Sequence, residues 1–259
     1  MAQLWQQSID SLTTESDLWS LFHENSKTSR YDAPISNAQV LARMRQMWDV
    51  LPYEGCETYP LPEPEPADGP LSEAILNRVT ARNIAPVQIP LKRLSTLLRY
   101  AYGVTRENED GSMPRPFRTV PSGGALYPLE IYFHTSYVDD LPAGLYHFDP
   151  RNSAVQLIQN GDSSPQIGDA LVQPGLSVGS SIVFFITAIF ERSTFKYNSR
   201  GYRFALLEAG HVAQNINLTA TSLQMGVVNI GGFFDREIDR FLQVDGITQS
   251  TIYMLAVGG

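Results

Sequence analysis

Two neighbouring residues, Lys196 and Tyr197, are the strongest candidates for acid–base chemistry in this chain. They come between an apolar segment, residues 182–190, and a long helical pattern, residues 200–225, so we expect them in a loop at the end of a buried strand. A cation beside a phenol stabilises the phenolate, which can accept a proton. The chain has only three lysines against sixteen arginines, which favours a specific use of Lys196. A surface dipeptide in an arginine-rich composition is the alternative.

An arginine pair suits the binding of an anion. Arg78, Thr80 and Arg82 alternate along the chain, so in extended backbone their side chains project to one face and can converge on one phosphate. Solvated surface arginines explain the same spacing. The sequence has no GxxxxGK segment and no strand–GxGxxG–helix pattern, which argues against an ordinary P-loop or dinucleotide site.

Two glycine pairs could bring backbone close to a flat ligand. Ser122, Gly123 and Gly124 precede a predicted strand, and Gly231 and Gly232 follow an apolar segment. Adjacent glycines allow close approach and can point amides at a bound group. Tight turns need glycine as well, so each pair also has a purely structural explanation.

Metal and thiol chemistry are poorly supported. A single cysteine, Cys56, excludes an intrachain disulfide and a Cys-based zinc site, and the four histidines are scattered. Glu208 and His211 have the Glu-x-x-His spacing of di-iron bundles, but those need two copies and further carboxylates. We therefore expect no metal, and we expect the polar residues around Glu208 to be satisfied by hydrogen bonds or to face a subunit interface.

Composition restricts the classes further. The 259 residues carry a net charge of −8, which argues against a general nucleic-acid binder. The N-terminus lacks the basic and apolar regions of a signal peptide, and residues 182–190 are too short to span a bilayer. A cytoplasmic protein with no membrane segment is the expectation.

The chain divides by composition at about residue 70. Residues 1–70 hold four basic and eleven acidic side chains and form a predicted helical arm, with capping boxes at 14–17 and 36–39 and an extended Pro-rich linker from residue 59. Residues 71–259 form the predicted main domain.

In the main domain, helical and strand patterns alternate. Helices are predicted over 91–102 and 200–225, and strands over 129–135, 144–148, 154–158, 182–190 and 251–257. The 200–225 pattern is apolar almost all round, so we expect a buried helix, with Gly210 permitting close approach of another helix. The prediction is an α+β fold with a mixed sheet around a long buried helix, completed by a partner subunit.

Six segments, taken in order, resemble the nitroreductase-like flavoproteins, and among these the SagB-type azoline (thiazoline/oxazoline) oxidases. The segments are Arg78-x-Thr-x-Arg82, Pro-Ser-Gly-Gly-Ala-Leu-Tyr-Pro at 121–128, Gly-Leu-Tyr-His-Phe at 144–148, Lys-Tyr-x-x-Arg-Gly-Tyr-Arg at 196–203, Glu-x-Gly-His-x-x-Gln-Asn at 208–215 and Gly-Gly-Phe at 231–233. The likeness runs from about Leu71 to the C-terminus, and residues 22–29 of the arm also resemble that subgroup.

The resemblance implies an intertwined homodimer with FMN at the interface. It assigns Arg78, Thr80 and Arg82 to the phosphate side, and Gly231 and Gly232 to the reactive part of the flavin ring. It places the 122–124 segment against the ring, from the other subunit. Unlike many relatives, the sequence has no basic residue after position 240, so the phosphate should depend more on the two arginines.

The implied reaction is dehydrogenation of thiazoline or oxazoline rings to thiazole or oxazole in peptide natural-product biosynthesis. The flavin accepts a hydride, Tyr197 removes a proton with Lys196 beside it, and dioxygen reoxidises the flavin. The substrate would be an azoline-bearing peptide or a carrier-bound intermediate, and a cyclodehydratase or synthetase complex is an implied partner. Two alternatives stay open: an NAD(P)H-dependent nitro or quinone reductase, and a flavin-bound scaffold subunit with the arm as docking surface.

Overall fold

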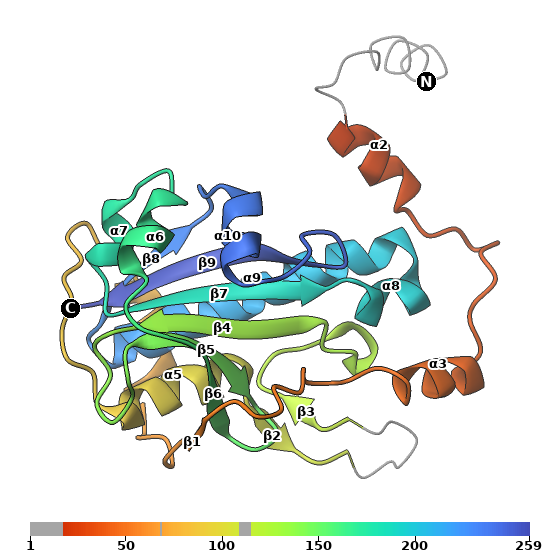
Figure 1. Ribbon diagram of the computed structural model, residues 1–259. Helices are drawn as coiled ribbons and strands as arrows, with labels where there is room; N and C mark the ends of the chain where they lie inside the picture. Colours follow the sequence, from red (N-terminus) through yellow and green to blue (C-terminus); the bar gives the residue numbers. More distant parts are fainter. Residues whose placement is uncertain (1–17, 68, 109–114) are drawn as a thin grey trace.

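The computed structural model describes residues 18–67, 69–108 and 115–259 (Figure 1). Its centre is a seven-stranded sheet in which neighbouring strands pair antiparallel, in the order β1-β6-β5-β4-β7-β9-β8. Parallel contacts among the described residues are the isolated bridges of Thr80 with Val227 and of Ile89 with Val138. The strands are β1 (Thr58–Pro60), β4 (Leu129–Thr135), β5 (Gly144–Asp149), β6 (Ala154–Asn160), β7 (Ile182–Ile189), β8 (Gly226–Ile230) and β9 (Gln249–Gly258). The predicted α+β class is confirmed. In the part of the chain that the structure describes, the parallel pairing expected of a mixed sheet is limited to these two isolated bridges.

Strand β7 is buried on both faces because its apolar side chains feed two cores. Phe184 and Ile186 belong to one core cluster, whereas Val183 and Phe185 belong to the other. Alternate residues of a strand project to opposite faces, so a continuous apolar run is what a central strand requires. β7 pairs with β4 along its length, from Thr135 opposite Ile182 to Leu129 opposite Ala188.

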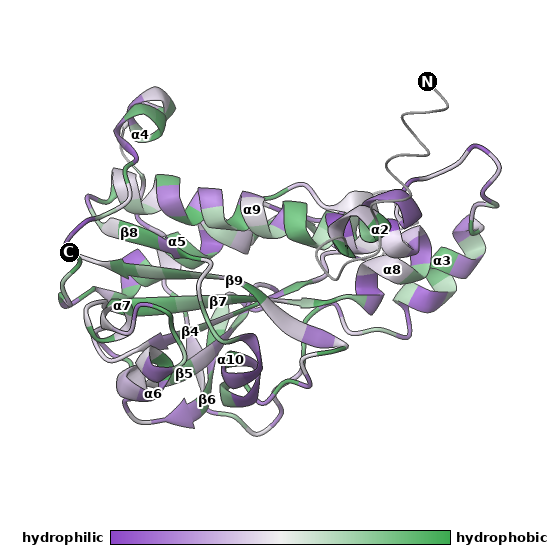
Figure 2. Cartoon of the chain, turned by 90° about the horizontal axis from the view of Figure 1, so that it is seen from above, coloured by the Kyte–Doolittle hydropathy of each residue, from purple (hydrophilic) through white to green (hydrophobic). Residues whose placement is uncertain are grey.

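Helices cover both faces of the sheet, giving three layers (Figure 2). One face carries α5 (Leu91–Tyr102) and α9 (Ser199–Ser222), and the other carries α6 (Ser164–Asp169), α7 (Gly175–Val178) and α10 (Asp235–Phe241). Within the described ranges, no helix is both long and apolar enough to cross a membrane.

Helix α9 is buried along one face only, which corrects the expectation of burial all round. Ala205, Val212 and Ile216 face the core, whereas Leu207 on the outer face is 61% exposed. Gly210 is exposed as well, with nothing within 4 Å of the position a Cβ would take. The apolar outer face is therefore free in a single chain.

The arm lies along the main body and contributes to its sheet. It contains α2 (Leu18–Asn25) and α3 (Asn37–Met44), and α4 (Leu71–Asn77) follows the linker at the start of the main domain. The predicted capping box of Ser36 and Gln39 is confirmed at the start of α3, and the one predicted at 14–17 lies outside the described residues. Residues 58–60, expected in an extended linker, instead pair with β6 as an edge strand, a position that tolerates Pro60.

Candidate active site

Lys196 and Tyr197 are the last two residues of α8 (Glu191–Tyr197), which directly follows β7. The expected loop is therefore a short helix, which ends because Asn198 adopts a φ of 49° and reverses the chain into α9. Left-handed conformations are costly for residues other than glycine, and Asn tolerates them best. The sharp reversal places the dipeptide at a corner between two helices.

The glycine loop meets this dipeptide because of strand pairing. β4 and β7 are antiparallel, so the segment before Leu129 and the segment after Ile189 emerge at the same edge of the sheet. A Cβ on Gly124 would lie 2.7 Å from the hydroxyl oxygen of Tyr197 and 2.8 Å from Nζ of Lys196. Both functional groups thus reach one point on the loop backbone.

The loop holds an unusual conformation beside the dipeptide. Gly124 lies within the 3₁₀ turn η2 (Gly123–Ala125) at a φ of 65°, and Ala125 and Tyr127 also have positive φ. A Cβ on Gly123 would lie 3.0 Å from the ring of Phe204, which packs edge-on against Tyr197 with 4.9 Å between ring centroids. The structure therefore brings Lys196 and Tyr197 together with the predicted 122–124 segment.

Gly124→Ala is expected to displace the two functional groups while leaving the fold intact. The new methyl group would meet the far ends of two flexible side chains, so Lys196 and Tyr197 must move. We expect turnover to fall roughly tenfold and stability to fall by about 1–2 kcal/mol from the positive φ. Gly55→Ala is the matched control, because Gly55 has a φ of 83° and open space around it. Equal turnover of the two variants would contradict the close approach of Lys196 and Tyr197 to Gly124.

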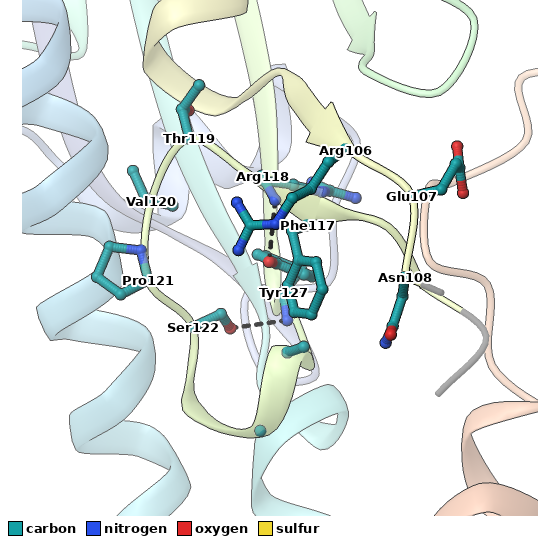
Figure 3. A pocket seen from close by; sticks show the side chains of 12 residues that line it. Arg106, Glu107, Asn108, Phe117, Arg118, Thr119, Val120, Pro121, Ser122 and Tyr127 are labelled. Carbon is teal, nitrogen blue, oxygen red and sulfur yellow. Dashed lines mark hydrogen bonds between the residues drawn. The ribbon is translucent and has the colours of Figure 1, made fainter. Parts of the chain in front are cut away.

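A cavity of about 1030 Å³ opens on the other side of this loop (Figure 3). Two hydrogen bonds hold its wall: the Tyr127 N–H donates to Ser122 Oγ at 2.9 Å, and the Arg118 N–H donates to the Tyr127 hydroxyl at 3.0 Å. Arg106 and Phe117 come from the small sheet of β2 (Val104–Arg106) and β3 (Phe117–Arg118) and line the cavity as well. The predicted Ser122 and Gly124 thus border a space large enough for a ligand.

A buried acid lies behind the cavity. The Arg118 guanidinium stacks on the ring of Tyr102 at 4.4 Å, and the Tyr102 hydroxyl donates to Glu208 Oε1 at 2.7 Å. Burial raises the pKa of Glu208 to about 7, even though hydrogen bonds from Ser122 and Tyr102 act in the opposite direction. Glu208 Oε1 is hydrogen-bonded as expected, whereas no well-directed hydrogen bond reaches Oε2 among the described residues. The sequence did not reveal the proximity of Glu208 to Ser122.

Glu208→Gln is expected to change how stability depends on pH. The pKa of Glu208 is about 7 in the folded chain against an ordinary 4.5, so the folded state holds the proton more tightly. Its contribution is therefore complete below about pH 4.5 and is lost as pH rises towards 7, by about 3 kcal/mol. The free energy of unfolding, measured in urea, should rise in the variant relative to wild type by about that amount between pH 5 and pH 8. A pH-independent difference would contradict the raised pKa.

The remaining predicted cofactor residues lie around β8. Thr80 bridges to Val227, which holds the 78–82 segment along this edge strand; Arg78 is half-buried and Arg82 is exposed. Gly231 and Gly232 follow the end of β8, and both are exposed. No atom lies within 4 Å of a Cβ position at Gly231, so a ligand could approach its backbone directly.

One chain does not bring the arginine segment to the dipeptide. Helix α4, which precedes Arg78, borders a small cavity with Thr219 near the C-terminal end of α9, whereas Gly123 contacts Phe204 near its N-terminal end. Along the helix axis these points are roughly 22 Å apart. Figure 2 shows α4 and α8 at opposite ends of α9.

Residues 75–259, the main body of the chain, match the nitroreductase family. The chain belongs to the nitroreductase family. MJ1384 of Methanocaldococcus jannaschii, named for the same family, is 37% identical over 174 residues, which cover 67% of this chain and 84% of that protein. The microcin B17-processing protein McbC of Escherichia coli is 32% identical over 164 residues, which cover 58% of this chain and 54% of McbC. The chain therefore spans about half the length of McbC.

A solved structure matches nearly the whole fold. A chain of the E. coli microcin synthetase McbBCD complex, with truncated pro-MccB17 bound, aligns with a TM-score of 0.58 at 21% identity and covers 97% of this chain and 96% of its own length. At this identity the match establishes the fold, and its coverage includes the arm region.

A buried ionic network fixes α8 in this nitroreductase-family chain. Glu130 on β4 lies 2.6 Å from NH1 of Arg192 on α8, and the His147 ring N–H donates to it at 2.7 Å. The three side chains are 2% exposed or less. Burial alone would raise the pKa of Glu130, but Arg192 and His147 outweigh it and lower the pKa to about 2. Sequence reasoning missed this network, since isolated charges along a chain are usually solvated.

Proposed function

We propose that the chain is an FMN-dependent oxidase that dehydrogenates thiazoline or oxazoline rings to thiazole or oxazole in peptide natural-product biosynthesis. The observation that carries the proposal is the convergence of Lys196 Nζ and the Tyr197 hydroxyl on the backbone of Gly124. A base and a cation beside a glycine loop suit proton removal from a substrate bound next to a flat cofactor. The similarity to McbC, a peptide-processing protein, supports a biosynthetic role.

The residues around β8 and the glycine loop fit FMN. Its phosphate needs cations, which Arg78 and Arg82 supply, and its flat ring needs close backbone, which Gly231, Gly232 and the 122–124 loop offer. When bound, FMN would accept a hydride from the substrate carbon and pass the electrons to dioxygen.

The side chains of the site account for the other half of the reaction. Aromatisation of an azoline removes two electrons and two protons, as one hydride and one proton. Tyr197 takes the proton from the carbon next to the carbonyl, and Phe204 holds its ring in place. Lys196, with Nζ 5.2 Å from the Tyr197 ring centre, stabilises the negative charge that develops on the substrate carbonyl.

We infer a homodimer that completes the site. The glycine loop and the arginine segment lie toward opposite ends of α9, so a second copy can supply what the first lacks. The outer face of α9 provides a surface for it, because Leu206 and Leu207 are exposed and Gly210 leaves room for a neighbouring helix. The synthetase complex that contains the matching McbBCD chain further suggests a cyclodehydratase or synthetase as an additional partner.

Leu207→Glu is expected to convert the dimer to monomer and to abolish FMN retention. A carboxylate in the centre of an apolar helix interface is strongly unfavourable. Light scattering gives the mass, and absorbance after gel filtration gives the bound flavin. Ile247→Glu is the matched control, since Ile247 is also exposed and apolar but lies in the turn before β9. A Leu207→Glu dimer that keeps its flavin would contradict the inferred interface.

The oxidase proposal is tested with purified protein, FMN and an azoline-bearing peptide. Mass spectrometry should show a product lighter by two hydrogen atoms, formed with consumption of dioxygen. The similarity to MJ1384 favours the alternative, a reductase of nitro compounds or quinones. Rapid bleaching of the flavin by NADPH without azole formation would select that alternative, and protein that never takes up FMN would overturn both.

A further inference from the structure

A second cavity opens onto Lys196 and Tyr197 from the side of the arm. Its volume is about 740 Å³, and its walls come from arm residues 25–28 and 32–35 and from residues 196–200 and 204. We propose that the arm residues in this lining, 25–28 and 32–35, form the substrate-binding wall of the site and contact the peptide on either side of the azoline ring. This inference rests on the proposed function, because it takes the azoline ring of the substrate to be the group that binds beside Tyr197.

The size and chemistry of the cavity suit an extended peptide. Its volume exceeds what a five-membered ring needs, so flanking groups must fill the remainder. Side-chain amides and hydroxyls line both walls, Asn25 and Thr28 on the arm and Asn198 and Ser199 at the start of α9. Such groups can both donate to peptide carbonyls and accept from peptide N–H groups. This is the pattern required to bind a peptide largely through its backbone.

The arm is fixed on one side of the cavity by α2. The ring of Phe22 packs edge-on against Tyr202 of α9, with 5.3 Å between centroids. The Arg203 guanidinium lies 5.7 Å from the Phe22 ring centre and donates to the carbonyl of His23. The start of the 25–35 segment is thereby attached to the helix that follows the catalytic dipeptide.

The arm is fixed on the other side by α3. Val40 and Met44 are buried against Leu126, which follows the glycine loop, and Tyr197 packs against the same cluster. On the surface, Arg43 forms an ion pair with Glu191 at the start of α8. The end of the 25–35 segment is thus attached to the glycine loop and to α8.

Between these attachments, no hydrogen bond among the described residues joins residues 27–34 to the main body. The hydrogen bonds that the structure gives residues 27–34 stay within the arm, such as those of Ser29 and Tyr31 within the 29–32 turn. A strap held at both ends, with backbone groups still available, can pair with a peptide lying between it and α9. The arm therefore acts as a wall of the site, not as a separate docking module.

The test compares two double variants on two substrates. Lys27→Ala/Thr28→Ala removes two lining side chains, and Arg30→Ala/Tyr31→Ala removes two neighbours outside the lining. The substrates are an azoline-bearing octapeptide and the same azoline as a small N-methyl amide. We expect the lining variant to raise KM for the octapeptide at least tenfold, with kcat and the small amide unchanged. The control variant should match wild type on both.

Three outcomes would overturn the proposal: an equal loss on both substrates, an equal loss in the control variant, or no change in the lining variant. Binding of a fluorescent thiazole-containing octapeptide, measured by anisotropy, separates this inference from the proposed function. Weaker binding to the lining variant alone would support the wall even if wild type made no azole. Azole formation without any arm dependence would retain the oxidase and reject the wall.

Discussion

Tyr197→Phe is expected to lower kcat for azole formation by roughly 10²–10⁴-fold, the range for loss of a positioned general base. The ring contacts of Tyr197 with Phe204 and the arm cluster need no hydroxyl, so folding and flavin content should be retained. Only the group that meets the Gly124 backbone is removed. Turnover measured at saturating peptide, with bound flavin quantified on the same sample, separates loss of chemistry from loss of cofactor.

The matched control for this variant is Tyr202→Phe. Tyr202 lies in α9 and packs on Phe22 and Phe190, so its ring also has aromatic neighbours, but it is not among the atoms nearest to Gly124. We expect it to retain full turnover. Lys196→Arg should recover part of the activity lost in Lys196→Ala if the cation stabilises charge. Full product formation by Tyr197→Phe would reject the base and favour the scaffold alternative.

Much of the fold could be predicted from apolar periodicity. The pattern of 182–190 identified a central strand, and the structure has β7 over Ile182–Ile189, because a run that must bury both faces is apolar throughout. The elements that were missed are short. Helix α8 and the edge strand β1 span too few residues to establish a repeat, and their conformation depends on tertiary contacts.

The site residues were predicted in separate segments, but their proximity could not be. Lys196 meets Gly124 only because β4 and β7 pair antiparallel in a register that brings the two flanking loops to one edge. Strand order is a property of topology, which single-segment patterns do not contain. The arm was understood as an acidic appendage, whereas its packing against Leu126 and Tyr197 arises from contacts far apart in sequence.

Removal of Arg192 is expected to be the most destabilising single change in the region of the site. Arg192→Met leaves the Glu130 carboxylate buried, and among the described residues its remaining hydrogen-bond partners are His147 and the Leu51 N–H, the latter at 3.1 Å. Losing one member of a buried ion pair costs about 3–5 kcal/mol, because the other charge stays uncompensated. Chemical denaturation at pH 7 measures the loss. Because α8 carries Lys196 and Tyr197, turnover should fall in the folded fraction as well.

A surface ion pair between α3 and α8 provides the control for this prediction. Arg43 pairs with Glu191 at the start of α8, but both side chains are largely solvated, so Arg43→Met should cost no more than about 1 kcal/mol. Adding Glu130→Gln to Arg192→Met should recover part of the stability, because the stranded charge is then removed. If Arg192→Met and Arg43→Met proved equally mild, Glu130 would not be the anchor of α8. The position of Lys196 and Tyr197 would then depend on the 122–128 loop and the arm instead.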